Sequence, residues 1–194
     1  MSRNVVELTS QLVAIQSETP QSNRPVSDFL KEVLEEAGFA VEVLSYFDPN
    51  GEEKVNLVGK KGSGTGGLGL FSHSDTVPGN VGWQPFTPEV KQGKLYGRGS
   101  CDMKGPLAAT IVAASRFDAA QLTKPLFIAV TSDEENGHTG SHFIVAESKT
   151  LTSAWPEFCV VCEPSELVPV YAHKGGARIS VTARGIAAHT STDK

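Results

Sequence analysis

Hydrophobic residues recur along the chain first at helical and then at extended spacing. Over residues 5–15 they return every three or four positions, which is the pattern of an amphipathic helix. A second stripe of the same kind runs over 26–37 and meets Gly38, a common helix stop. The intervening residues 17–25 are polar and include two prolines. The pattern therefore predicts two helices joined by a loop.

Short apolar segments then predict strands over 39–43, 55–58 and 68–71. A turn signal, Asp-Pro-Asn-Gly over 48–51, separates the first two. The glycines of 62–67 match the letters of a dinucleotide-binding loop, but such a loop must open a helix. Because these glycines lead into a strand, we interpret them as a surface connection.

The second half of the chain alternates between helical and fully apolar segments. We expect a hairpin over 90–96, a helix over 106–117 and another helix over 141–147. The continuous apolar runs 125–131 and 158–162 are typical of strands buried on both faces. This alternation predicts an α/β fold with a mostly parallel, mixed sheet flanked by helices.

Length and charge exclude several classes of protein. The chain has 194 residues, of which 39% are hydrophobic and 20% charged, which suits one globular domain and part of another. A net charge of −5 argues against a nucleic-acid partner. No apolar run reaches the about 18 residues of a membrane span, and the N-terminus lacks the apolar core of a signal peptide. We therefore expect a cytoplasmic protein with no membrane partner.

Three cysteines, Cys101, Cys159 and Cys162, provide no disulfide framework because their number is odd. Cys159 and Cys162 have the spacing of half a zinc knuckle, but no second pair completes four ligands. We expect both to be small buried strand residues. A cysteine hydrolase built on Cys101 or Cys162 lacks any local signature.

Acidic residues and one histidine gather where the predicted strands end. His73 and Asp75 close one strand, and residues i and i+2 of an extended chain point to the same side. Residues 133–135, Asp-Glu-Glu, close the next apolar run, and Glu163 closes the one after. Asp102 lies in a glycine-rich turn ahead of a helix. Ligands bind outside the carboxyl ends of strands in open α/β sheets, so we expect these side chains at one rim.

So many carboxylates in one place repel one another, which either raises their pKa values or attracts divalent cations. The histidine among them favours zinc or another transition metal over calcium or magnesium. The adjacent Glu134 and Glu135 can divide the work, one as a ligand and the other as a general base toward water. The alternative for this acidic triplet is a solvated loop without a metal.

With the strand-end residues in view, four segments resemble the ordered motifs of the M20 metallopeptidases, a family that includes acetylornithine deacetylase, succinyl-diaminopimelate desuccinylase and carboxypeptidase G2-type enzymes. The resemblance runs from near the N-terminus to the end of the chain. Its motifs are His-Ser-Asp-Thr-Val-Pro over 73–78, Gly-Arg-Gly-Ser-Cys-Asp-Met-Lys-Gly over 97–105, Thr-Ser-Asp-Glu-Glu over 131–135 and Glu-Pro-Ser over 163–165.

The resemblance implies a zinc-peptidase-like catalytic domain with two divalent metal ions, zinc by preference and cobalt as the alternative. His73 and Glu163 would bind one metal, Glu135 the other, and Asp102 would bridge both. Three further residues, Asp75, Glu134 and His189, would act without binding metal. Asp75 would orient His73, and Glu134 would be the general base that passes a proton to the leaving amine.

Two later segments narrow the resemblance. Residues 169–175, Pro-Val-Tyr-Ala-His-Lys-Gly, are similar to the corresponding stretch of acetylornithine deacetylases. Residues 185–191 resemble the start of the family's α+β lid, which also forms the dimer. His189 would there reach the partner subunit's active site and stabilise the tetrahedral oxyanion, although a plain surface histidine is the alternative. The implied domains are 1–175, catalytic, and 176–194, the beginning of the lid.

The chain departs from the family in length. Family members are roughly twice as long, as two domains require, and their returning C-terminal portion supplies a last histidine ligand to the second metal. His138, His142 and His173 do not occupy that motif. We therefore expect an N-terminal fragment, truncated at the start of the lid, that is by itself a poor enzyme.

The resemblance implies a zinc-dependent hydrolase of N-acyl amino acids, with N-acetylornithine, an intermediate of arginine biosynthesis, as the first candidate substrate and a homodimer as the full-length form. The near alternatives are succinyl-diaminopimelate desuccinylase and an M20 carboxypeptidase or dipeptidase. A different class is a truncated, catalytically inactive metal-binding protein. An intact Glu134 disfavours that class, because metal storage needs no general base.

Overall fold

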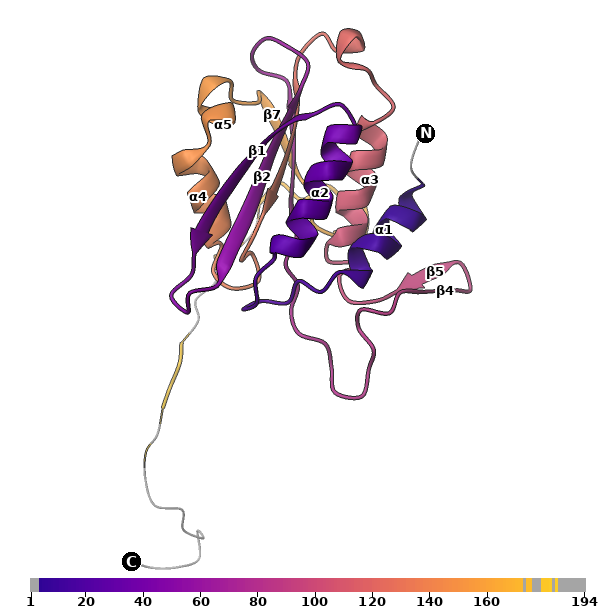
Figure 1. Cartoon of the computed structure of the whole chain (residues 1–194), viewed down its shortest axis with the longest axis vertical. Helices are drawn as coiled ribbons and strands as arrows, with labels where there is room; N and C mark the ends of the chain where they lie inside the picture. Colours follow the sequence, from indigo (N-terminus) through magenta and orange to yellow (C-terminus); the bar gives the residue numbers. More distant parts are fainter. Residues whose placement is uncertain (1–3, 173, 176–178, 183, 185–194) are drawn as a thin grey trace, which may run out of the picture. The chain divides into compact units, whose positions relative to one another are not determined.

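A five-stranded mixed sheet organises the structure, which is a computed structural model (Figure 1). It describes residues 4–172, 174–175, 179–182 and 184. The strands follow the order β1-β2-β6-β3-β7, with bounds Ala40–Phe47 for β1, Glu53–Lys61 for β2, Leu126–Thr131 for β6, Leu68–His73 for β3 and Phe158–Val161 for β7. Strand β2 runs antiparallel to β1 and β6, whereas β3 runs parallel to β6 and β7. The expected mixed sheet is confirmed.

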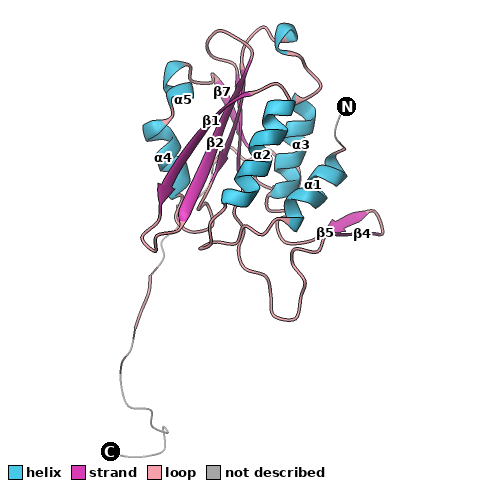
Figure 2. Ribbon diagram, viewed as in Figure 1, coloured by secondary structure: helices cyan, strands magenta, loops and turns pink. Residues whose placement is uncertain are grey.

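Helices cover both faces of this sheet (Figure 2). One face carries α1 (Val5–Ala14), α2 (Arg24–Glu36) and α3 (Lys104–Ala114), and the other carries α4 (Thr139–Glu147) and α5 (Lys149–Ser153). The predicted hairpin forms β4 (Glu89–Lys91) and β5 (Lys94–Tyr96), and a 3-10 turn, η1, spans Ala119–Gln121. The sequence pattern missed α5 and η1, and it placed the end of α3 too late, because Phe117 continues the apolar stripe beyond the helix.

The two faces of β6 show why a fully apolar strand is needed there. Ile128 and Val130 join the core under α1, α2 and α3, whereas Phe127 and Ala129 join the core under α4 and α5. All four are at most 3% exposed, so the expectation of a strand buried on both faces is confirmed for 125–131. This packing fixes the end of β6, from which the acidic triplet emerges.

Strand β7 contradicts the same expectation. Phe158 is 65% and Val161 64% exposed, Cys159 is exposed and Cys162 is half-buried, although all were predicted to be buried. The reason is position: β7 lies at the edge of the sheet and, within the described residues, pairs only with β3. An apolar sequence therefore identified the strand but not its place in the sheet.

Lys61, at the end of β2, is a buried cation that binds backbone carbonyl groups at the ends of two helices. Its Nζ donates to the carbonyl oxygen of Ala37, the residue after α2, at 2.7 Å and to that of Ala114, the last residue of α3, at 3.2 Å. A cation suits the carbonyl end of a helix, where the backbone acceptors have no partners of their own. Lys61 thus holds both helices against one end of the sheet.

The chain forms two units, and the division falls between Pro164 and Ser165. The described residues of the second unit contain no helix or strand. The predicted boundary between 175 and 176 stays a prediction, and most of 176–194 lies outside the described residues. None of the helices in the described part of the chain is both long and apolar enough to cross a membrane.

Candidate metal centre

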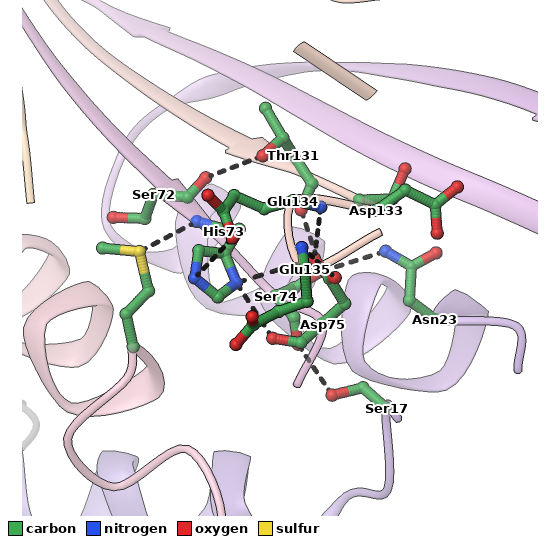
Figure 3. A network of polar contacts seen from close by, with 12 residues as sticks. Ser17, Asn23, Ser72, His73, Ser74, Asp75, Thr131, Asp133, Glu134 and Glu135 are labelled. Carbon is green, nitrogen blue, oxygen red and sulfur yellow. Dashed lines mark hydrogen bonds and ion pairs between the residues drawn. The ribbon is translucent and has the colours of Figure 1, made fainter. Parts of the chain in front are cut away.

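His73 is the last residue of β3, and its position in the sheet buries it. The side chain is 2% exposed because β3 runs between β6 and β7. Its backbone N–H donates to the sulfur of Met103 at 3.2 Å. Its Nδ1 lies 2.9 Å from the carbonyl oxygen of Asp75, and this contact orients the ring so that Nε2 meets the neighbouring carboxylates (Figure 3).

Three carboxylates surround Nε2 of His73. Asp102 Oδ1 lies at 3.2 Å, Glu163 Oε1 at 3.5 Å and Glu134 Oε2 at 3.8 Å. They come from the turn before α3, from the end of β7 and from the turn after β6. Parallel strands place their carboxyl ends at the same edge of a sheet, which is why segments distant in sequence meet here.

The Asp75 carboxylate holds the turn that carries both glutamates. Its Oδ1 accepts from the Glu134 N–H at 3.2 Å and its Oδ2 accepts from the Glu135 N–H at 3.1 Å. The nearest carboxylate oxygen is 3.6 Å from His73 Nδ1, farther than the Asp75 carbonyl oxygen. Asp75 therefore touches His73 through its backbone and directs its side chain to the glutamate turn (Figure 3).

Residues absent from the motifs anchor the segment that follows His73. Ser17 donates from Oγ to the Ser74 carbonyl at 2.7 Å, and Asn23 donates from Nδ2 to Ser74 Oγ at 2.9 Å. The Ser74 N–H donates to the Thr131 carbonyl at 3.0 Å. Ser17, Asn23 and Ser74 are all at most 1% exposed. The sequence did not predict this role for Ser17 and Asn23, because both lie in the segment 17–25, which was predicted only as a polar loop.

Crowding changes the proton affinity of the candidate ligands. Burial disfavours the charged ring of His73, but the adjacent Asp75 carboxylate, with Glu163 and Glu134, outweighs burial and raises the pKa of His73 to about 9. Burial and the neighbouring carboxylates raise the pKa of Glu163 to about 7, against the lowering effect of His73. Burial likewise raises the pKa of Glu135. Without a cation, the cluster retains protons.

Two sets of side chains bring ligand atoms within 4.8 Å of one another. One set is His73, Asp102 and Glu163, and the other is His73, Glu134 and Glu135. Imidazole nitrogen with carboxylate oxygen is a donor set that binds zinc and other divalent transition metals. The residues present therefore fit a divalent metal, and their crowded negative charge is what such a cation relieves.

Not every candidate residue joins this cluster. His138 places Nδ1 at 3.3 Å from Glu134 Oε1, a contact that sequence reasoning did not foresee. Cys101 is exposed beside Asp102. His189 and His173 lie outside the described residues, so the predicted role of His189 stays a prediction.

Comparison with known proteins places this geometry in a family. Residues 69–192 match the family described as Peptidase family M20/M25/M40. The chain belongs to the M20 family. It is 40% identical to acetylornithine deacetylase of Proteus mirabilis (strain HI4320) over 195 residues, which cover 96% of this chain and 49% of that protein. The chain thus spans about half the length of the curated relatives it matches.

Solved structures of other proteins share the fold. Human carnosine dipeptidase 1 superimposes with a TM-score of 0.68 at 23% identity, covering 81% of this chain and 38% of that chain. An M20 family metallo-carboxypeptidase from Sulfolobus solfataricus gives a TM-score of 0.64 at 19% identity, covering 77% of this chain and 35% of that chain. Membership of this metallopeptidase family implies use of a divalent metal.

Proposed function

We propose that the chain carries the catalytic metal centre of a zinc-dependent hydrolase that cleaves the amide bond of N-acyl amino acids, with N-acetylornithine as the first substrate. The observation that carries the proposal is the convergence of Asp102, Glu134 and Glu163 on Nε2 of the buried His73. The identity of 40% to an acetylornithine deacetylase supports the choice of substrate.

The ligands divide as the family resemblance implies. His73 and Glu163 would hold one ion, Glu135 the other, and Asp102 would contact both; zinc is the proposed ion and cobalt its alternative. When bound, divalent cations polarise the amide carbonyl and lower the pKa of water. Asp75 would keep the ring and the glutamate turn in place through the contacts of its carbonyl and carboxylate oxygens.

Glu134 is suited to the general base. Its side chain is 32% exposed, so it can meet water and substrate, while its backbone N–H is held by Asp75. Its Oε2 faces His73 and its Oε1 faces His138. Glu134 would accept a proton from the attacking water and return it to the amine nitrogen as the amide bond breaks.

The test is a comparison of Glu134→Gln with the unchanged chain. Zinc binding is measured on this chain by titration calorimetry, and hydrolysis is followed in the whole protein as acetate released from N-acetylornithine. The variant keeps the size of the side chain but cannot accept the proton, so we expect near-normal zinc affinity with turnover reduced about 10²–10⁴-fold. Glu147→Gln, at the exposed end of α4, is the matched control.

Three results would redirect the proposal. Faster hydrolysis of N-succinyl-diaminopimelate or of a dipeptide would replace the substrate and keep the mechanism. A zinc-loaded whole protein that hydrolyses none of the three would favour a non-catalytic metal-binding protein. Equal turnover of the whole protein with and without Glu134→Gln would exclude Glu134 as the base. We further propose a cytoplasmic location and a homodimer for the whole protein.

A further inference from the structure

Lys54 is a buried lysine outside the motif residues. It lies on β2, where its side chain is 2% exposed. Its Nζ donates to the carbonyl oxygens of Pro20 and Gln21, each at 2.8 Å, and lies 3.0 Å from Asp133 Oδ1. Two of the ammonium hydrogens therefore go to carbonyl oxygens, and the Asp133 carboxylate is the ion-pair partner of the charge. A buried charge of this kind is costly and is weak support for stability alone, so a further role must be considered.

Asp133 connects this lysine with the glutamate turn. Its side chain is 6% exposed, and its second oxygen, Oδ2, accepts from the Tyr46 hydroxyl at 2.7 Å. Burial raises the pKa of Tyr46, so the hydroxyl keeps the proton that it donates. Strand β2 thus supplies a cation, and strand β1 a hydroxyl donor, to the same carboxylate.

The backbone of Asp133 also shapes the turn. Its φ of 54° is left-handed, a conformation that costs energy in a residue with a side chain. Its carbonyl oxygen accepts from the His138 N–H at 2.8 Å and from the Asn136 N–H at 3.3 Å. Asp133 is therefore held at its side chain while its carbonyl closes the turn that contains Glu134 and Glu135.

We propose that Lys54, Tyr46 and Asp133 form a positioning unit that fixes the turn carrying Glu134 and Glu135 toward the metal centre. The turn is then held from two sides. On one side, the Asp75 carboxylate accepts hydrogen bonds from the N–H groups of both glutamates. On the other, the positioning unit holds Asp133, the residue immediately before them. None of the three residues has a candidate ligand role; they act through the turn, as supporting groups around metal ligands commonly do.

The role assigned to Glu134 and Glu135 rests on the proposed function, whereas the placement of their turn does not. The two are therefore tested by different measurements on the whole chain. Hydrogen exchange of the Glu134 and Glu135 backbone amides, followed by NMR in the metal-free protein, reports the turn. Calorimetric titration with Co²⁺ reports the metal centre.

The variants are Tyr46→Phe and Asp133→Asn, with Lys61→Met as the control for loss of a buried charged group elsewhere in the sheet. Tyr46→Phe removes one hydroxyl and keeps the ring beside Phe143, whose centroid lies 5.0 Å away. Lys61 lies on the same strand as Lys54, is 4% exposed and donates to two carbonyl oxygens at helix ends. Lys54→Met itself leaves a buried carboxylate without its cation, so it is the least favourable variant for folding.

We expect Tyr46→Phe and Asp133→Asn to speed exchange at Glu134 and Glu135 by at least about tenfold while the β6 amides change little. Co²⁺ affinity should fall about 10–100-fold, as it does when groups supporting metal ligands are removed. Lys61→Met should change neither quantity in the folded protein.

Unchanged exchange and unchanged affinity in both variants would overturn the positioning unit. Equal acceleration throughout the sheet, or the same local effect in Lys61→Met, would also overturn it, since the effect would then be global. If the unchanged chain binds no Co²⁺, the proposed function fails, and the exchange rates alone decide whether Tyr46 and Asp133 position the turn.

Discussion

Binding of a divalent cation to the metal-free chain should expel protons, because two candidate ligands hold protons near neutral pH. Their raised pKa values are about 9 for His73 and about 7 for Glu163. A metal needs the neutral imidazole and the ionised carboxylate. Metal affinity should therefore fall as the pH falls, since each group must first lose its proton.

The number of protons follows from these two values. At pH 7, His73 is almost fully protonated and contributes about one proton, while Glu163 contributes about half. The total is about 1.5 protons per metal at pH 7 and about a quarter of a proton at pH 9.5. Linkage then predicts an affinity that rises at least about tenfold per pH unit between pH 6 and pH 8.

Calorimetry in buffers of different ionisation enthalpy measures this release directly. The slope of the observed enthalpy against the buffer enthalpy is the proton number. Glu163→Gln removes one ionisable ligand and one charge that supports protonation of His73, so its release at pH 7 should be below about one proton. A release below about half a proton at pH 7 in the unchanged chain, or an equal release at pH 9.5, would refute the reasoning.

Two predictions concern stability. Burial lowers the pKa of Lys104 to about 7 from its ordinary 10.5. Between these two pH values the folded state binds fewer protons than the unfolded state, so its stability rises with pH. In urea unfolding at pH 7 and 9.5, Lys104→Met should reduce this dependence by up to about 1.4 kcal/mol per pH unit, and an unchanged dependence would contradict the prediction. An added Cβ at Gly140 would lie 2.2 Å from the Ser132 carbonyl oxygen and 2.5 Å from Asn56 Oδ1. Gly140→Ala should therefore cost about 2 kcal/mol or more of unfolding free energy, and a loss below about 0.5 kcal/mol would show that the helix start yields without strain.

The contrast between β6 and β7 shows that an apolar pattern predicts a strand but not the burial of that strand. Both runs predicted buried strands, and both strands exist, because local sequence carries the extended conformation. Burial depends on neighbours: β6 lies between β2 and β3, whereas β7 is at the edge. Position within a sheet is set by long-range pairing that no local window contains.

The candidate site was more predictable than its support. His73, Asp102, Glu134 and Glu163 could be selected because they follow strand ends or a glycine-rich turn, and parallel strands bring such residues together. Lys54 could not be selected in this way, because a lysine in a strand is ordinarily an exposed residue. Its burial depends on carbonyl groups from a distant loop that only the folded chain supplies.

The parallel pairing of β3 with β6 and β7 has a consequence for the folding order. His73 is on β3, whereas the glutamate turn and Glu163 follow strands that come much later in the chain. Closing such large loops precedes any gain from the contacts they form, and it slows folding. The carboxylates can surround His73 only after the sheet has assembled. A metal ion would therefore stabilise the finished fold and slow its unfolding, without serving as the nucleus from which the chain begins to fold.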